Sequence, residues 1–484
     1  MKIDLLCEPE LQFGSGRHVD IRFGLMRHGM LDADEITSPK IIRVGVVGTQ
    51  ETVDRLLAWW SKCAEGVDAK ESKQPNLFPK FPGFGEGKEL RASLESDSRL
   101  QRIISRRDLA RVRSVGNTEE SITEATEVLL QEMEYLMQTA RPDVLVCALP
   151  WDMLEITEHR LRADEDLHEE TDQEEPATKL NLHHLLKAKA MKLGVPIQII
   201  KPSTYGLPCP QRLAKRRRRK GTIQDEATRA WNMYIALYYK AGGRPWRLTR
   251  DPTALSTCFV GISFYRSLDE KSLQTSVAQV FNERGEGIIV RGGPAQITRE
   301  DRQPHLTSED AYALIESALV LYRQEHRTMP ARVVLHKSSS YTDGEIEGFG
   351  RAIDGHGVEV ADFMNLRPSS LRLLRTGAYP PVRGTLLFLD DATCILYTKG
   401  SVPFFRTYPG MYLPRPLEIS YQAIDGGLPQ LLPEEILALT KMNWNNTQFD
   451  GGDPITLAAA RRVGAILKYI DADGPVAPRY SFYM

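Results

Sequence analysis

Hydrophobic residues in the first half of the chain fall into short runs that alternate with segments of helical periodicity. Ile41–Val47 is apolar enough for a buried strand, and a helix is expected from Thr49 to about Cys63. A second helix over Glu119–Thr139 directly precedes the apolar strand Asp143–Leu149. Strands alternating with helices in this way predict a parallel sheet that helices cover on both faces. Ligands of such sheets bind at the carboxyl ends of the strands.

The second half of the chain shows a different order of elements. A strand is expected over Thr257–Tyr265, and hairpin-like strands follow it. A helix with Ser308 at its N-cap then continues to Glu325. The other expected elements are strands at Ser276–Phe281, Gly287–Arg291, Arg332–His336, Val358–Val360 and Gly384–Leu389, and helices at Asp343–Ile353, Pro433–Lys441 and Ile455–Tyr469. Hairpins followed by alternating helices and strands predict a mixed α/β domain.

Composition limits the possible functions of the chain. Its 484 residues are 42% hydrophobic and 26% charged, as in soluble globular proteins with two or three domains. The formal net charge is −2, so nucleic acid would need basic groups gathered in one groove. The six cysteines show no Cys-x-x-Cys spacing, and neither a zinc site nor a disulfide framework is indicated. With no signal peptide and no apolar run near 18 residues, we expect a cytoplasmic protein without membrane contact.

Two charged segments interrupt the first half. Residues 163–176 are too acidic to pack into a core, which predicts a solvated loop. A run of six cations follows later, at Lys215, Arg216, Arg217, Arg218, Arg219 and Lys220. This run is either a bare surface loop or a contact for nucleic-acid phosphates, and the sequence leaves both interpretations open.

A helix and the strand after it carry three polar side chains that are expected to converge. His183 and Lys187 are four residues apart in a segment without Pro or Gly, so on a helix they share one face. The apolar run Val195–Ile200 predicts a buried strand, and its one amide is Gln198. His183, Lys187 and Gln198 could bind one small ligand together.

A fourth polar residue, Lys240, ends a later helix directly before Ala-Gly-Gly. Two cations, an imidazole and an amide around one point suit a terminal phosphate, which carries about −1.5 to −2 charges. Each residue also has a purely structural interpretation. His183 and Lys187 would then be solvent-exposed, Gln198 a hydrogen-bonded core amide, and Lys240 a cation that stabilises the helix dipole.

These motifs resemble the MID domain of Argonaute proteins, where the corresponding residues hold the 5′ end of a guide strand. Four segments of the second half match the PIWI domain of the same family, namely Phe259–Ser263, Val333–Lys337, Leu439–Asn445 and Pro454–Ala459. Together these matches cover nearly the whole chain. The chain is specifically similar to short prokaryotic Argonautes, which have MID and PIWI domains but no PAZ domain.

The resemblance implies an α/β chain with a Rossmann-like MID domain followed by a ribonuclease-H-like PIWI domain. Residues 1–40 would form an arm that packs on the PIWI half, 41–247 the MID domain and 248–484 the PIWI domain. His183 stands where many relatives carry an aromatic hydroxyl. It would stack on the first guide base or bond to the phosphate, which leaves its protonation state open.

The same resemblance predicts that this PIWI half does not cleave nucleic acid. Two-metal cleavage needs several carboxylates that hold two divalent ions. The catalytic positions of the family fall at Ser263, Ser338 and about Ala459, and none of these residues has a carboxylate. Glu300 lies where the glutamate finger of the family is expected, but one carboxylate does not make a metal pair. Asp343 and Glu345 are interpreted as first-turn residues of a helix.

The resemblance also implies a role for the end of the chain. The terminal carboxylate, on Met484, would join the guide phosphate in holding Mg²⁺. The apolar and aromatic residues of this tail are more typical of a segment that packs on the protein itself.

A protein that binds a guide without cutting can only report recognition. The resemblance implies a guide RNA, a complementary single-stranded DNA target and a separate APAZ-containing effector as partner. The effector would carry a TIR or sirtuin-like domain that consumes NAD, or a nuclease, and would act against plasmids or phage. Specificity would come from base pairing, and binding should weaken as salt rises.

Two other functions were compared with this one. The first is a guided nuclease whose metal ligands lie elsewhere in the chain. The second is a nucleotide-binding or phosphosugar-binding α/β protein, although no Gly-x-Gly-x-x-Gly or Gly-x-x-x-x-Gly-Lys-Ser/Thr pattern supports it.

Overall fold

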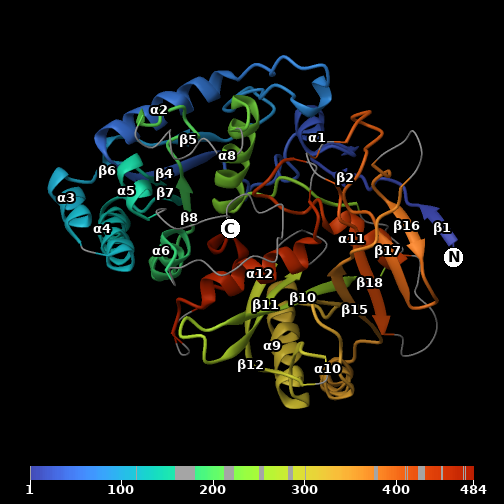
Figure 1. Cartoon of the computed structure of the whole chain (residues 1–484). Coiled ribbons are helices and arrows are strands. Elements are labelled where there is room, and N and C mark those ends of the chain that lie inside the picture. Colours follow the sequence, from blue (N-terminus) through green and yellow to red (C-terminus); the bar gives the residue numbers. More distant parts are fainter. Residues whose placement is uncertain are drawn as a thin grey trace. The chain divides into compact units, whose positions relative to one another are not determined.

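The computed structural model describes residues 2–115, 117–157, 180–211, 223–249, 255–281, 287–299, 301–374, 380–408, 410, 413–422, 431–448, 451–471, 474 and 476–484. The chain forms two compact units (Figure 1). Unit 1 comprises residues 1–24, 246–443 and 448–484, and unit 2 comprises residues 25–245 and 444–447. Residues 25–40, which were expected in the N-terminal arm, therefore group with unit 2.

Unit 2 contains a five-stranded parallel sheet. Its strands are β4 (Ile41–Gly48), β5 (Ser93–Glu95), β6 (Gln101–Ile103), β7 (Val144–Ala148) and β8 (Ile197–Ile200). The strand order is β5-β4-β7-β8, and β6 also pairs with β4. Every pair is parallel, and all five residues of β7 are buried. The parallel sheet predicted from the apolar runs is thus confirmed.

The helices of unit 2 connect these strands. They are α2 (Gln50–Glu65), α3 (Arg106–Ser114), α4 (Thr118–Thr139), α5 (Trp151–Thr157), α6 (Leu182–Ala190) and α8 (Glu226–Lys240), while the sequence boundary between the units, after residue 24, falls within α1 (Ile21–His28). Short 3-10 turns occur at Pro75–Leu77, Ser98–Leu100 and Met191–Leu193. Thr49 caps α2 in a capping box with Thr52, which fixes where the helix begins after β4. The Thr52 hydroxyl also donates to the carbonyl of Ala148, so this cap ties α2 to β7 at 3.0 Å.

Unit 1 contains a ten-stranded sheet. Its strands are β1 (Lys2–Leu5), β10 (Thr257–Arg266), β11 (Leu273–Phe281), β12 (Gly287–Ile297), β13 (Pro304–His305), β14 (Arg332–Lys337), β15 (Val360–Pro368), β16 (Thr385–Phe388), β17 (Thr393–Leu396) and β18 (Leu417–Gln422). The order is β1-β16-β17-β18-β15-β14-β10-β11-β12-β13. Only β10, β14 and β15 pair in parallel, and the other pairs are antiparallel.

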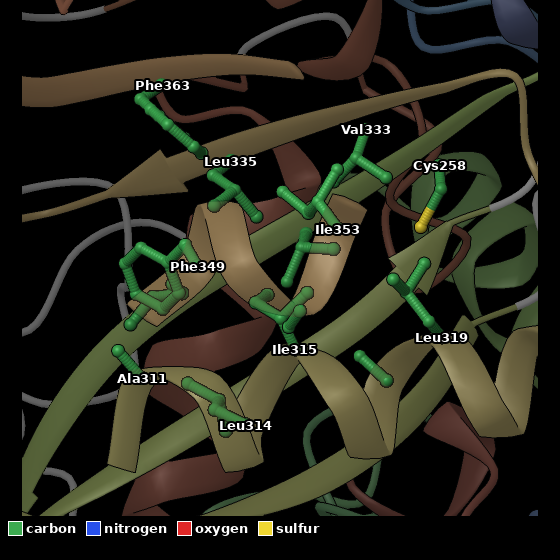
Figure 2. Packing of buried hydrophobic residues seen from close by; sticks show 14 of the residues in the cluster. Cys258, Ala311, Leu314, Ile315, Leu319, Val333, Leu335, Phe349, Ile353 and Phe363 are labelled. Atoms are coloured by element: carbon green, nitrogen blue, oxygen red, sulfur yellow. The ribbon is translucent and has the colours of Figure 1, made fainter. Parts of the chain in front are cut away.

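Two helices cover one face of the central strands of this sheet. These helices, α9 (Ser308–His326) and α10 (Asp343–Gly355), pack against β10 and β14 in a shared core (Figure 2). Ile315, Phe349 and Leu335 in this core are fully buried. Burying one such side chain contributes roughly 1.5–3 kcal/mol, so this core is a main source of the stability of unit 1.

A third helix, α12 (Ile455–Leu467), lies on the other face. A Cβ atom at Gly261 on β10 would lie 2.2 Å from the carbonyl oxygen of Thr456, so only glycine permits this approach. Residues 258, 260 and 262 of β10 belong to the core with α9 and α10. Because side chains alternate along a strand, Gly261 and its neighbours at 259 and 263 face α12.

The remaining elements of unit 1 are small. They are α11 (Leu431–Leu439), a 3-10 turn at Tyr480–Phe482 and a three-stranded sheet of β2 (Leu11–Gln12), β3 (Arg17–His18) and β9 (Arg247–Leu248). The N-terminal segment pairs through β1 with β16. Glu8 anchors it further, because its carboxylate accepts from Arg383 at 3.0 Å and from Lys441 at 3.2 Å. Burial lowers the pKa of Lys441 to about 8.

Two expected details differ from the structure. The N-cap of α9 is Thr307, whose hydroxyl accepts from the amide of Asp310, and not Ser308. The strand expected at Val358–Val360 begins only at Val360 and continues to Pro368 as a central strand of the sheet. No helix among the described residues is long and apolar enough to cross a membrane.

Candidate functional sites

The structure places His183 and Lys187 on α6 in unit 2. The helix begins at Asn181, whose side-chain oxygen accepts a hydrogen bond from the amide of His184 at 3.2 Å. His183 and Lys187 lie one turn apart on one helix face. Lys187 is only 2% exposed, whereas His183 is half-buried with its ring edge-on to that of His184. The expectation of a solvent-exposed Lys187 is therefore wrong.

Gln198 and Lys240 are in direct contact in the same unit. Lys240, the last residue of α8, donates from Nζ to Oε1 of Gln198 on β8 at 2.6 Å. The amide nitrogen of Gln198 is directed to the carbonyl of Ile199 at 3.3 Å. Both α6 and α8 pack against β8. The structure thus joins two of the four predicted residues by a hydrogen bond and sets the helix that carries the other two against the same strand.

Two basic side chains of this arrangement are buried. Lys187 and Lys240 are both nearly fully buried, and burying an ammonium group is unfavourable unless charged or polar partners compensate. The amide oxygen of Gln198 is one such polar partner of Lys240, and it carries no formal charge. A phosphate, with three acceptor oxygens, is a ligand of matching chemistry. We refer to the four residues His183, Lys187, Gln198 and Lys240 as the basic pocket, in the sense of a proposed binding site for a phosphate.

Magnesium does not fit the basic pocket without further ligands. Mg²⁺ requires oxygen ligands, and among the four pocket side chains only Gln198 offers an oxygen atom. That atom already accepts from Lys240. A phosphate and a carboxylate would have to supply the other oxygen ligands.

Several expected features lie outside the described residues. These are the acidic segment 163–176, the basic run from Lys215 to Lys220 and Glu300. Met484 is described, and it is buried in unit 1 together with Tyr483. The tail before it contacts β12, because the amide of Ile289 donates to the carbonyl of Pro478 at 2.7 Å. This agrees with the alternative of a packed C-terminal segment.

The three positions expected to carry catalytic carboxylates lie close together in unit 1. Ile262 on β10 is paired with Lys337 on β14, and the amide of Ser338 donates to the carbonyl of Ile262 at 3.4 Å. Ser263 on β10 and Ser338, directly after β14, therefore lie at neighbouring positions of two parallel strands, and the alternation along β10 directs Ser263 to the side that faces α12. Ala459 is fully buried, one turn after the α12 residue that contacts β10. The structure brings two hydroxyls and a methyl group to these positions.

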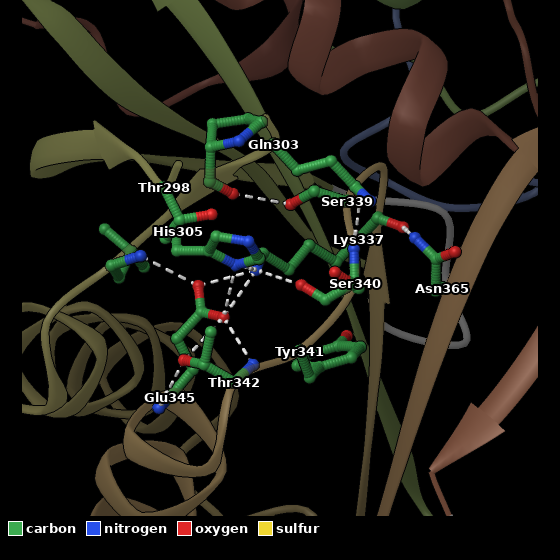
Figure 3. A network of polar contacts seen from close by, with 12 residues as sticks. Thr298, Gln303, His305, Lys337, Ser339, Ser340, Tyr341, Thr342, Glu345 and Asn365 are labelled. Carbon is green, nitrogen blue, oxygen red and sulfur yellow. Dashed lines mark hydrogen bonds and ion pairs between the residues drawn. The ribbon is translucent and has the colours of Figure 1, made fainter. Parts of the chain in front are cut away.

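A buried polar network next to these positions was not predicted from the sequence (Figure 3). Lys337 and Glu345 are both fully buried, and Lys337 Nζ lies 2.6 and 2.7 Å from the two carboxylate oxygens of Glu345. His305 contacts Glu345 at 3.2 Å through Nδ1 and Asp301 at 2.9 Å through Nε2. Ser340 donates to the same Asp301 oxygen at 2.9 Å. Hydrogen bonds from the Thr298 hydroxyl and the Gln303 amide, with smaller contributions from His305 and Ser340, hold the pKa of Asp301 well below its usual range. The network joins the end of β14, the start of α10 and the loop before α9.

The interpretation of Glu345 as a first-turn residue was thus incomplete. Its carboxylate does accept from the amide of Thr342 at 3.0 Å in a capping box. It also neutralises Lys337, and that role follows only from the position of α10 beside β14.

His336 occupies the α12 side of β14, opposite the side of Lys337. Its Nδ1 atom lies 2.8 Å from the hydroxyl of Thr456, and the ring is fully buried. Burial, assisted by the charge of Arg332, lowers the pKa of His336 to about 3. His336 is therefore neutral at physiological pH. In the part of the chain that the structure describes, no group of three or more His, Cys, Asp or Glu side chains is placed to hold a metal ion.

Known structures share this architecture. Clostridium butyricum Argonaute bound to a guide DNA and a 19-mer target DNA matches with a TM-score of 0.63 and 15% identity, over 97% of this chain and 53% of that one. Aa-Ago with externally bound siRNA matches with a TM-score of 0.60 and 15% identity, over 99% of this chain and 55% of that one. Drosophila Piwi matches with a TM-score of 0.59 and 13% identity, over 99% of this chain and 56% of that one. The chain spans about half the length of each of these proteins. No family model and no curated protein matches the sequence.

The fold is therefore that of an Argonaute-like α/β protein. In particular, the chain has the architecture of the MID–PIWI region, with unit 2 as the Rossmann-like part and unit 1 as the ribonuclease-H-like part. At 13–15% identity this likeness establishes the fold alone.

Proposed function

We propose that the basic pocket holds the 5′-phosphate of a guide strand, and that the guide is RNA. The observation that carries this proposal is the 2.6 Å contact between Lys240 Nζ and Gln198 Oε1, with the buried Lys187 on the neighbouring helix. A second cation and an imidazole one turn apart suit a ligand with several acceptor oxygens. Mg²⁺ held by oxygen atoms of the guide phosphate belongs to the same proposal.

The bound guide selects complementary single-stranded DNA by base pairing, and the protein does not cut it. Support comes from Ser263, Ser338 and Ala459, which occupy the expected catalytic positions without a carboxylate. A two-metal mechanism needs carboxylate ligands on adjacent strands. In this proposal the chain recognises the target DNA and does not itself catalyse a reaction on it.

An effector protein converts recognition into a response. On the resemblance stated above, this partner contains an APAZ region and forms a heterodimer with the chain. It carries a TIR or sirtuin-like domain that depletes NAD in defence against plasmids or phage, and a nuclease effector is the alternative. Identifying the protein that copurifies with the natively expressed chain tests this part of the proposal.

The decisive experiment compares guides that differ only in their 5′ group. The wild-type chain should retain a 5′-phosphorylated RNA much more strongly than the same RNA with a 5′-hydroxyl. The Lys187→Ala and Lys240→Ala variants should lose this difference. Equal retention of both guides by the wild-type chain would refute the proposed pocket.

The chain offers a matched control on the same segment. Lys192 follows α6 and pairs with Glu134 at 2.7 Å on the surface. Lys192→Ala removes one positive charge of the same kind from unit 2. It should keep the preference for the phosphorylated guide, so a general loss of charge would not explain the result.

A further inference from the structure

The first strand of the ten-stranded sheet has one open edge. Within the described strands, β1 pairs only with β16 and stands last in the sheet order (Figure 1). Its two large apolar side chains, Ile3 and Leu5, are 57% and 61% exposed. An exposed sheet edge presents unpaired backbone groups to other strands. For this reason edge strands usually carry charged side chains or are covered by a helix or loop. Apolar side chains on such an edge indicate a docking surface.

The backbone directions of β1 are fixed by its pairing with β16. The amide of Leu6, directly after β1, donates to the carbonyl of Gly384 on the β16 side at 2.9 Å. Backbone groups of successive residues in a strand point alternately to opposite edges. The N–H and C=O groups of Ile3 and Leu5 are therefore directed away from β16, toward the open edge.

We propose that β1 pairs antiparallel with β1 of a second copy of this chain, with Ile3 opposite Ile3 of the partner subunit. Only residues with outward backbone groups can face each other as a hydrogen-bonded pair. This limits self-pairing to three symmetric registers, centred on Ile3, Asp4 or Leu5. A register centred on Asp4 brings two carboxylates together, which is unfavourable.

The charges of β1 select among these registers. With Ile3 at the centre, Lys2 lies opposite Asp4 of the partner subunit, and Asp4 lies opposite Lys2 of the partner subunit. Opposite charges across a strand pair are stabilising, and with Leu5 at the centre no two residues of β1 form a charge pair. Lys2 and Asp4 already share one face of β1, where they are 2.6 Å apart. The strand is thus complementary to itself in one register only, and the pairing would be isologous, as in twofold dimers.

Cysteine cross-linking tests the register directly. In a hydrogen-bonded antiparallel pair the Cα atoms are about 5.5 Å apart, which suits a disulfide. In a Cys7→Ser background, which removes the exposed native thiol, Ile3→Cys should form a covalent dimer under mild oxidation. Leu5→Cys in the same background should cross-link far less, because Leu5 does not face itself in this register.

A charge-reversal experiment separates pairing between chains from stability within one chain. Lys2→Asp and Asp4→Lys each break the internal ion pair and place like charges across the proposed interface. Each variant alone should be monomeric by analytical ultracentrifugation. An equimolar mixture should associate, because every cross-strand pair in the mixed dimer is again of opposite charge.

The proposal fails if the wild-type chain stays monomeric at high concentration. It also fails if Ile3→Cys and Leu5→Cys cross-link equally well or if the mixed variants do not associate. Ile3→Pro removes an outward N–H without removing a hydrogen bond to β16, and it should abolish self-association while the melting temperature stays unchanged. If Ile3→Pro instead releases a different copurifying protein from a monomeric chain, the edge belongs to that partner and self-pairing is refuted.

Discussion

Lys240 and Gln198 are joined by a hydrogen bond of 2.6 Å between Nζ and Oε1, although they lie 42 positions apart in the sequence. The contact joins the end of α8 to the last strand of the parallel sheet. A substitution at position 198 that changes the charge of this side chain therefore changes the net charge of the basic pocket.

Replacing Gln198 by Glu should block the pocket without unfolding it. The new carboxylate would form an ion pair with Lys240 and would repel a phosphate. We expect the affinity for a 5′-phosphorylated guide to fall by about tenfold or more, which corresponds to roughly 1.4 kcal/mol. Filter binding with matched 5′-phosphate and 5′-hydroxyl guides measures this. Unchanged affinity for the phosphorylated guide would place the phosphate elsewhere.

Cleavage assays should show no magnesium-dependent cutting of a matched target by the purified chain. Ser263→Ala and Ser338→Ala should change guide and target binding by less than about twofold, because neither hydroxyl can replace a metal-bound carboxylate. Cutting that persists through rigorous purification would mean that the metal ligands lie elsewhere in the chain. It would support the guided nuclease as the function.

Breaking the buried pair of Lys337 and Glu345 should be costly. Both side chains are fully buried, and removing one partner leaves an uncompensated charge. Lys337→Met or Glu345→Gln should each lower the free energy of unfolding by about 3–5 kcal/mol in urea denaturation. The double variant Lys337→Met/Glu345→Leu should recover a large part of the loss.

An exposed ion pair provides the comparison for this prediction. Arg351 and Glu309 are 3.0 Å apart with side chains 45% and 77% exposed. Arg351→Ala should cost less than about 1 kcal/mol. If Lys337→Met and Arg351→Ala lower the free energy of unfolding by similar amounts, the buried Lys337–Glu345 pair contributes no more to stability than an exposed ion pair.

His336 should make the protein sensitive to acid. Its pKa is about 3 in the folded chain and near 6.5 when unfolded, so between these values the unfolded chain binds the additional proton. The stability linked to His336 is complete above pH 6.5 and is lost as the pH falls toward 3, by an amount on the order of 5 kcal/mol. His336→Gln should flatten the fall of the urea midpoint between pH 6.5 and 4.

The hydrophobic pattern was sufficient for elements whose buried residues are mostly apolar. β4, β7 and α4 were predicted within about two residues, because the buried hydroxyls of Ser121 and Thr126 in α4 leave the period of the helix intact. β15 was mostly missed. Its buried residues include Asp362, which pairs with Arg332 at 2.7 Å, and Asn365, which donates to the carbonyl of Lys337. A central strand with such residues does not show the apolar run of its neighbours.

The candidate sites were predictable to different degrees for a similar reason. Spacing along α6 was enough to place His183 and Lys187 on one face, because four residues make one helical turn. The pairing of Lys337 with Glu345 depends on how α10 packs beside β14, and no local sequence pattern predicts this packing. A charged residue near a helix start is usually exposed, so the fully buried Glu345 was assigned the ordinary role.

The pairing of β1 with β16 has a consequence for how the chain acquires its structure during synthesis. The partners of residues 2–5, at 385–388, are made nearly four hundred residues later. Residues 25–245 of unit 2 form a continuous stretch and can assemble as soon as they emerge, whereas unit 1 also needs residues 246–443 and 448–484. Strand β1 therefore remains without its sheet until residues 385–388 have been made. Contacts between residues this distant in sequence also form slowly, so closure of this sheet is expected to be a late event in folding.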